Sequence, residues 1–415
     1  MMDNCPILHI DINNCYASIS ILHHPKLKGH PVAVGGSVES RHGIILARNY
    51  EAKPYGIHVG LALWQARQKC PNLIIIPPEY DKYLKYGRLF RNILADYTDL
   101  VESFGLDECW CDVSRCLKLY GSGEAIAQEI RERVKSELGV TVSIGVSYNK
   151  IFAKLGSDIK KPDAVTLISK TNFRDLVWPL PAEDLLGVGR ATIGKFHHYG
   201  IKTIGDIANS GIDTLKSLFG KWGEYLYVYA NGLDSSPVKK VGFEAAVKSV
   251  GNSTTCPRDL ENEDDARIVF HNLADSVSER MRELGLMAKT VQISLRTNDL
   301  QWCERQMALP QATMIAAELA ETAMLLLKEN YTWEKPLRSI GIRGTQLTPI
   351  NSVRQLSLLE NEEERQQLER LEYTIDDIRR RYGYHAVGKA LLAVDEKLGK
   401  LNAKADHVLH PVGYL

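Results

Sequence analysis

Residues 7–16 read Ile-Leu-His-Ile-Asp-Ile-Asn-Asn-Cys-Tyr. The apolar run at the start ends at Asp11, and a helix-like pattern follows it. A short apolar run bounded by polar residues predicts a buried strand that ends in a turn. A second acidic group, Asp107-Glu108, lies between strand-like runs at 101–106 and 109–113, which predict a hairpin. If these strands are neighbours in one sheet, the three acids meet at one place.

Three carboxylates at one place repel one another and become tolerable when divalent cations bind between them. Oxygen ligands of this kind suit Mg²⁺, which takes the rest of its shell from water and substrate phosphates. Two such ions would activate an attacking oxygen and stabilise a leaving one, as in nucleotidyl transfer. The alternative is that Asp11 caps a helix and that Asp107 and Glu108 are ordinary turn acids.

The order of the expected helices and strands divides the chain into regions of different secondary structure. Strand and helix patterns alternate through the first 165 residues, which predicts an α/β region with a helix-backed sheet. Short helices punctuated by glycine follow from Pro179, and they predict a small helical domain. The next unit is expected to be α+β, with helices at 262–284 and 311–330 and strands at 290–295 and 337–342.

Composition excludes several classes of protein. The chain has 51 Lys+Arg and 51 Asp+Glu, so its overall charge does not point to a nucleic-acid or membrane partner. No run of 18 apolar residues occurs, and the first ten residues lack the basic region of a signal peptide. The eight cysteines form no Cys-x-x-Cys pair, so we expect reduced thiols rather than disulfides or a zinc site. These features predict a cytoplasmic protein without a membrane partner.

A series of motifs in the order of the chain resembles the Y-family translesion DNA polymerases, and most of all their bacterial DNA polymerase IV and UmuC-domain branch. The resemblance covers about residues 5–345 and includes the acids at 11, 107 and 108. The motifs lie at 7–17, 48–57, 106–108, 143–154, 160–162, 186–190 and 248–255.

The resemblance implies a multidomain right-handed polymerase fold, α/β and α+β, with palm, fingers, a helical thumb containing a helix–hairpin–helix, and a little-finger domain. Its expected boundaries are as follows: palm 1–11 and 74–165, fingers 12–73, thumb 166–232, linker 233–241, little finger 242–345, and a tail over 346–415 with a clamp-binding peptide.

The same resemblance implies the roles of individual residues. Asp11, Asp107 and Glu108 match the catalytic metal ligands, with the carbonyl of Ile12 as a further ligand for two Mg²⁺ ions. Asn13 stands where many members have a second Asp that is not a usual ligand. Residues at the positions that contact the incoming nucleotide are Asn14, Cys15, Tyr16, Tyr50, Lys53 and Lys161.

Two of these positions carry specific expectations. Lys53 replaces a common Arg and so loses the bidentate fork with which Arg grips phosphate. Tyr16 matches the steric gate that rejects ribonucleotides, a task that suits a bulky ring with few torsions; the alternative is an aromatic residue buried at a helix start.

Expected DNA contacts lie in the thumb and the little finger. Gly187 and Gly189 match a helix–hairpin–helix whose backbone N–H groups approach a DNA phosphate, although a turn between packed helices is the alternative. Residues 239–345 carry 14 basic and 15 acidic residues, which is against a broadly positive domain. DNA binding there requires the cations on one face, opposite the acids at 261–265. The expected cations and contacts are Lys239, Lys240, Lys248, Ser249, Arg258, Lys289, Arg296 and Arg343.

A short peptide past the last domain resembles the pentapeptide by which bacterial polymerases dock on the sliding clamp. It consists of Gln355, Leu356, Ser357, Leu358 and Leu359, with Leu359 where Phe is common. A polar anchor followed by apolar side chains suits a hydrophobic groove. We therefore expect the clamp, primer–template DNA and deoxynucleoside triphosphates as partners of a monomeric protein.

The sequence thus predicts an error-prone translesion DNA polymerase without proofreading that acts in DNA repair and damage tolerance. Two alternatives remain at this point. A nucleotidyl cyclase could use the same acids but has no use for the thumb motif or the clamp peptide. A catalytically weak DNA-binding scaffold of the repair system would keep those modules and would not need the acids.

Overall fold

The computed structural model describes residues 6–36, 43–243, 246–352, 362–401 and 403. They form two compact units, which are described separately. The first contains residues up to 35 and from 45 to 243, and the second contains nearly all residues from 246 onward. Within the described residues no helix is long and apolar enough to cross a membrane.

A five-stranded sheet forms the palm of the first unit. Its central strand, β1, is the apolar run that ends at Asp11, and it pairs antiparallel with β6 on one side and β7 on the other. The order is β5-β6-β1-β7-β8, with β1 Ile7–Ile12, β5 Val101–Phe104, β6 Glu108–Asp112, β7 Val142–Ser147 and β8 Val165–Ile168.

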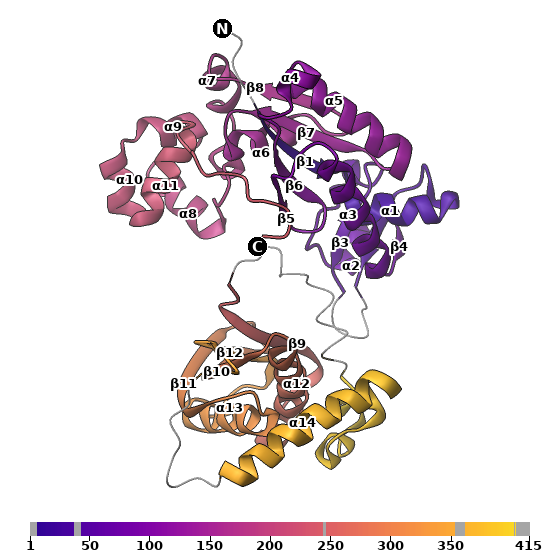
Figure 1. Cartoon of the computed structure of the whole chain (residues 1–415), viewed down its shortest axis with the longest axis vertical. Helices are drawn as coiled ribbons and strands as arrows, with labels where there is room; N and C mark the ends of the chain where they lie inside the picture. Colours follow the sequence, from indigo (N-terminus) through magenta and orange to yellow (C-terminus); the bar gives the residue numbers. More distant parts are fainter. Residues whose placement is uncertain (1–5, 37–42, 244–245, 353–361, 402, 404–415) are drawn as a thin grey trace. The chain divides into compact units, whose positions relative to one another are not determined.

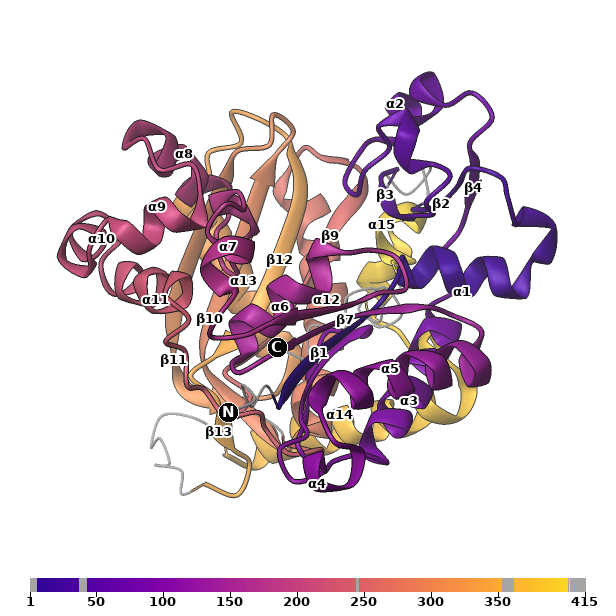
Figure 2. The same cartoon turned by 90° about the horizontal axis from the view of Figure 1, so that it is seen from above.

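Side chains of β1 alternate between two covered faces of this sheet. Leu8, Ile10 and Ile12 enter a core with helices α3 (Tyr80–Ala95) and α5 (Gly123–Arg133). His9 faces the opposite helix, α6 (Lys150–Ile159), where its ring meets Ser157. Figure 2 shows α3 and α5 on one side of the sheet and α6 on the other. Both faces are therefore covered, and Asp11 lies at the end of a buried strand.

The fingers are a smaller α/β region with their own core. Strand β2 (Val32–Gly35) pairs antiparallel with β3 (Ile45–Arg48) and parallel with β4 (Ile74–Ile76), beside helix α2 (Leu63–Lys69). Helix α1 (Cys15–His23) contributes Cys15 and Ile19 to the palm core. It also packs on β2 and β3, so it joins the two regions, and the fingers boundary at residue 12 stays a prediction.

The thumb is helical, as the glycine-punctuated sequence indicates. It consists of α7 (Phe173–Val177), α8 (Arg190–His198), α9 (Ile204–Asn209), α10 (Ile212–Phe219) and α11 (Lys221–Ala230).

The segment at 233–241, predicted to be a linker, packs on the palm. Val238 is buried with Ile7 and Trp110, and the Lys239 N–H donates to Glu102 Oε2 over 3.1 Å.

The second unit contains the little finger, a four-stranded antiparallel sheet. Its order is β11-β10-β12-β9, with β9 Ser249–Leu260, β10 Leu286–Thr297, β11 Trp302–Thr313 and β12 Leu337–Thr345; β13 (Thr348–Pro349) pairs with β10.

Helices α12 (Glu263–Glu283) and α13 (Ala316–Asn330) cover one face of this sheet. The helix predicted over 311–330 begins only at Ala316, because 302–313 is an edge strand. Pro310 lies between Ala308 and Thr313, where the pairing with β10 shifts register, and such an irregular stretch tolerates a residue without an N–H.

The C-terminal segment, predicted to be a tail, belongs to this unit. Helix α14 (Glu362–Tyr382) and the short α15 (Glu396–Gly399) pack on it, and Figure 1 shows α14 alongside α12 and α13. The Asn272 amide donates to the carbonyls of Gly399 and Leu401, which anchors the end of the segment.

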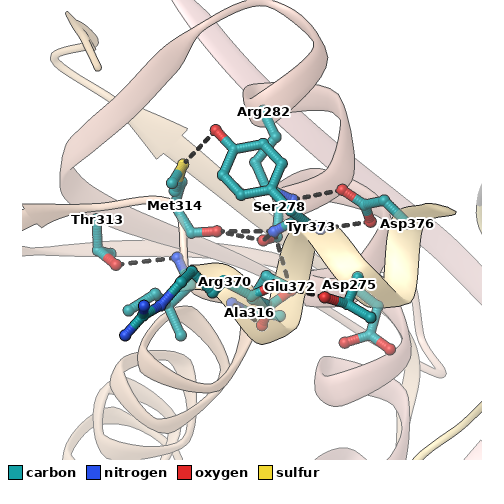
Figure 3. A network of polar contacts seen from close by, with 12 residues as sticks. Asp275, Ser278, Arg282, Thr313, Met314, Ala316, Arg370, Glu372, Tyr373 and Asp376 are labelled. Carbon is teal, nitrogen blue, oxygen red and sulfur yellow. Dashed lines mark hydrogen bonds and ion pairs between the residues drawn. The ribbon is translucent and has the colours of Figure 1, made fainter. Parts of the chain in front are cut away.

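Charged side chains make most of the α14 interface (Figure 3). Asp376 accepts a bidentate pair from Arg282 over 2.6 and 2.7 Å, and Glu372 lies 2.9 Å from the same guanidinium. The Arg282 side chain is only 2% exposed. Arg379 pairs with buried Asp275 over 2.9 Å. A buried charge whose partner is removed is costly, so these pairs fix the position of the helix.

Asp376→Ala is expected to lower the free energy of unfolding of the second unit by about 3 kcal/mol, because Arg282 stays buried without its bidentate partner. Asp377→Ala, which breaks the exposed pair with Arg380 on the same helix, should cost less than about 1 kcal/mol. Urea unfolding followed by circular dichroism measures both. Equal losses in the two variants would show that the buried network does not hold α14.

Candidate active site

Strand pairing brings the three acids together. Asp11 lies directly opposite Glu108 in the antiparallel register of β1 and β6. The Ile12 N–H donates to the Asp107 carbonyl over 3.0 Å, so the hairpin turn is held against the end of β1. Directly opposed residues in an antiparallel pair project to the same face. The convergence predicted from the spacing is therefore present in the backbone.

The turn after β1 depends on the side-chain amide of Asn13. Its Nδ2 donates to Ser143 Oγ over 2.8 Å, and its Oδ1 accepts from Thr141 Oγ1 and the Asp163 N–H. An Asp here would lose the donor, which gives a physical reason for Asn in this chain. Asn14 follows in the left-handed region at φ 45°, which Asn tolerates, and α1 begins after it.

Two lysines neutralise part of the acidic charge. Lys161 pairs with Asp11 and lies 2.7 Å from Asp158, while Lys154 Nζ is 2.7 Å from Glu108 Oε2. His9 Nε2 is 3.1 Å from the same Glu108 oxygen. Accordingly, across the described part of the chain no three His, Cys, Asp or Glu side chains converge into a ready-made metal cluster.

The three carboxylates differ in their electrostatic state. Burial, together with the charges of Asp11 and Glu108, raises the pKa of Asp107 to about 7. Burial and the Glu108 charge raise the pKa of Asp11 to about 6, against the pull of Lys161. The pKa of Glu108 falls to about 2: burial acts to raise it, but His9 and Lys154 outweigh burial. Asp107 therefore carries the least compensated charge.

Sequence comparisons find three family models on this chain. The impB/mucB/samB family matches residues 10–158, and its C-terminal domain matches 247–358. The thumb domain of DNA polymerase iota matches 183–234. Together they cover the palm and fingers, the thumb and most of the little finger.

Relatives with assigned names match over nearly the whole chain. DNA polymerase IV of Acetivibrio thermocellus is 48% identical over 95% of this chain and 99% of its own length. The chain belongs to the DNA polymerase IV family. DNA polymerase IV 1 of Bacillus subtilis is 36% identical, with 92% of each chain covered.

Solved structures agree in fold with this member of the DNA polymerase IV family. A Y-family DNA polymerase chimera superposes with a TM-score of 0.73, at 22% identity, over 83% of this chain and 99% of its own. The palm, fingers, thumb and little-finger architecture that the resemblance implied is confirmed.

The residues expected to contact the nucleotide differ in their exposure and in how strongly the charges of the acids affect them. Burial raises the pKa of Tyr50; the charge of Lys161 acts to lower it, and the charge of Asp11 acts to raise it. Cys15 is buried, and the charges of Asp107 and Asp11 add to the burial that raises its pKa. Lys53 lies exposed on the short turn Lys53–Tyr55, outside this network of described contacts.

The thumb glycines differ in their surroundings. Gly187 has a φ of +85°, and a Cβ there would lie 2.4 Å from the Trp222 ring. Gly189 caps the start of α8 and has open space around it. Gly187 is thus required by packing and backbone conformation, whereas Gly189 leaves the first N–H groups of α8 approachable.

The single basic face that DNA binding by residues 239–345 would require does not include Arg258, Lys239 or Lys240. Arg258 makes a bidentate pair with Asp265, one of the acids predicted on the opposite face, and a further pair with Asp395. Lys239 and Lys240 belong to the first unit and pair there with Glu102 and Asp99. Attraction between near neighbours overrides the separation of charges that the sequence count suggested.

A smaller set of cations and polar residues does share the open face of the little-finger sheet. Ile293 and Ile342 point into the core, so Gln292 and Arg343, which pair across β10 and β12, point away from the helices. Arg296 lies two rows along on the same face, opposite Ser339. Ser249 begins β9 opposite Thr345, and Lys248 is exposed before it.

Sequence reasoning missed two residues that hold Glu108. His9 is a polar residue inside the apolar run before Asp11, which was a usable signal. It is fully buried, and its Nδ1 is 2.8 Å from Ser157 Oγ. Lys154 lies one turn after Lys150 on α6. Its partner is 46 residues away in sequence, so nothing local indicated the pair.

Asp107→Asn is expected to raise the melting temperature at pH 8 in buffer free of divalent cations. The folded pKa of about 7 exceeds the ordinary value of 3.8. The folded state therefore binds the proton more tightly, and the native protein loses stability as the pH rises through that interval. The gain of the variant should shrink toward pH 5, where Asp107 holds its proton. Scanning calorimetry across this pH range measures the effect.

Glu102→Gln is the control. Glu102 is paired with Lys150 over 2.7 Å, and this pairing outweighs burial and lowers its pKa. Its substitution should lower the melting temperature at pH 8. A loss of stability in Asp107→Asn as well would contradict the account of an uncompensated charge.

Proposed function

We propose that Asp11, Asp107 and Glu108 catalyse nucleotidyl transfer at the end of β1. As a member of the DNA polymerase IV family, the chain is a DNA-directed DNA polymerase of the translesion type. The observation that carries the assignment of the site is the register that sets Asp11 opposite Glu108, beside Asp107. A scaffold without catalysis would not need an acidic cluster that costs stability.

The acids fit Mg²⁺ in the chemistry of their donors. All three are hard carboxylate oxygens, and the raised pKa values of Asp107 and Asp11 show negative charge that the protein itself does not fully compensate. Asp11, Asp107 and Glu108, with the Ile12 carbonyl, would hold two Mg²⁺ ions. These ions supply an activated attacking oxygen and a stabilised leaving group when bound.

The proposed reaction joins a deoxynucleotide to a primer. The 3′-hydroxyl oxygen of the primer bonds to the α-phosphorus, the bond from that phosphorus to the bridging oxygen breaks, and pyrophosphate leaves with the electron pair. Lys161, which pairs with Asp11, would bind the triphosphate with its charge, and Tyr50 would add a short hydrogen bond. Lys53 would reach the phosphates from its exposed turn.

Proposed contacts with primer–template DNA are independent of base sequence. The free N–H groups at the start of α8, next to Gly189, suit a DNA phosphate. Ser249, Arg296 and Arg343 on the open little-finger face, and Lys248, which is exposed just before β9, suit further phosphates. Arg258 is left out of this set because both of its terminal nitrogens are paired within the unit.

Asp107→Ala is expected to abolish nucleotide addition while the fold and DNA affinity remain. Losing a ligand removes several kcal/mol of charge stabilisation, which corresponds to a rate loss of roughly three or more orders of magnitude. Primer extension with Mg²⁺ and the four deoxynucleotides measures the rate. Asp112→Ala, at the other end of β6, is the matched control and should keep near-normal extension. Near-normal extension by Asp107→Ala would refute the catalytic assignment.

Tyr16→Ala is expected to raise ribonucleotide incorporation, because Tyr16 lies at the start of α1 next to the acids. The Tyr16 ring would occupy the place of a ribose 2′-hydroxyl. Removing this ring should therefore increase ribonucleotide insertion by roughly two orders of magnitude. Deoxynucleotide insertion should fall much less. Single-nucleotide kinetics with matched ribo- and deoxyribonucleotides measures the ratio, and an unchanged ratio would reject the gate.

We further propose that Gln355, Leu356, Ser357, Leu358 and Leu359 dock on the sliding clamp; these residues lie outside the described part of the chain. Docking raises the effective concentration of enzyme at the primer end without altering chemistry. Alanine at both Leu358 and Leu359 is expected to remove stimulation by the clamp and leave insertion without the clamp unchanged. Full stimulation of this variant would show that the peptide is not the docking site.

A further inference from the structure

An aromatic stack lies behind the ring of Tyr16. The Tyr16 and Tyr83 rings are nearly parallel, at 6°, with centroids 4.3 Å apart. The Tyr80 ring stands edge-on to both, at 5.9 Å from Tyr16 and 5.8 Å from Tyr83. Tyr16 begins α1, whereas Tyr80 and Tyr83 lie in the first turns of α3. One face of the Tyr16 ring is therefore covered by the neighbouring helix.

Tyr83 is fixed more firmly than a core ring held by apolar contact alone. It is fully buried, and its hydroxyl hydrogen-bonds Ser20 Oγ over 2.8 Å. Ser20 is also buried and lies one turn after Tyr16, on the same side of α1. Tyr83 thus contacts α1 at two successive turns, which ties its ring to the helix that carries Tyr16.

The stack constrains which way Tyr16 can move. A flat ring at 4.3 Å is at the closest spacing of stacked aromatic side chains. Tyr16 therefore cannot retreat toward α3 unless Tyr83 moves, and Tyr83 is held in a close-packed core with Ile19 and Phe90. Tyr16 itself is half-buried, and the charge of Asp107 adds to the burial that raises the pKa of its phenol.

We propose that Tyr83 is a positioning residue for sugar specificity, because it fills the space into which the Tyr16 ring would otherwise yield. This inference rests on the proposed role of Tyr16 as the wall against the 2′-hydroxyl. A single added hydroxyl is rejected weakly by a surface that can give way, so discrimination depends on what stands behind the wall. Tyr83 acts through Tyr16 and needs no contact with the nucleotide.

The test compares Tyr83→Leu, Tyr83→Phe and Tyr97→Leu in the full chain. The measured quantity is kcat/KM for a deoxynucleotide divided by kcat/KM for the matching ribonucleotide. Tyr83→Leu is expected to lower this ratio by about tenfold or more, chiefly by raising ribonucleotide insertion. Tyr83→Phe keeps the stacked ring and should keep the ratio within about threefold.

Tyr97→Leu is the matched control, because Tyr97 belongs to the same core but stacks near Tyr120 instead of Tyr16. It should leave the ratio unchanged. An equal fall in Tyr97→Leu would mean that any softening of the core lowers discrimination, which overturns a specific role for Tyr83.

Tyr16→Ala, measured in the same assay, separates the proposed gate role of Tyr16 from the positioning role of Tyr83. If it lowers the ratio and Tyr83→Leu does not, the gate stands and the role of Tyr83 is wrong. If neither variant lowers the ratio, the gate itself is wrong and the inference falls with it. Should Tyr83→Leu fail to fold by thermal melting, Tyr83→Met replaces it, because it also removes the stacked ring. A fall in the ratio for Tyr83→Met supports the inference, and an unchanged ratio overturns it.

Discussion

The active site depends on one backbone constraint, the antiparallel register between β1 and β6. Asp11 faces Glu108 because the two strands pair from Ile7 with Asp112 to the end of β1. A slip by one residue would turn Asp11 to the apolar face that Leu8 and Ile10 occupy. The alternation that buries those side chains therefore also fixes the acids, so core packing and the proposed catalysis require the same register.

Charged side chains at two places in this chain differ in how fully they are paired. In the second unit, buried charges such as Arg282 and Asp376 are fully paired, so they specify how α14 packs (Figure 3). Beside the end of β1, Asp107 is half-buried next to the like charges of Asp11 and Glu108, which raise its pKa. A poorly compensated charge of this kind, unlike the paired ions at α14, indicates a site kept for function.

The sequence predicted the parts of the fold that leave a local pattern. The apolar run before Asp11 and the acids between two strand-like runs were enough to expect the catalytic cluster. Strand β11 was missed because an edge strand alternates polar residues such as Glu304 and Gln306 and contains Pro310. The packing of α14 was missed because its buried side chains are Arg365, Asp376 and Arg379, which read as a solvated helix. Lys161 and Asp11 are 150 residues apart, so their pairing had no local signal.

Metal location is the most direct test of the central claim that strand pairing assembles a two-cation site for nucleotidyl transfer. The measurement is anomalous scattering from Mn²⁺ in crystals of the chain with a primer–template that lacks the 3′-hydroxyl and the matching deoxynucleotide. The account predicts two peaks, both within coordination distance of carboxylate oxygens from Asp11, Asp107 and Glu108. Peaks bound elsewhere, with these carboxylates still paired only to Lys161, Lys154 and His9, would contradict it.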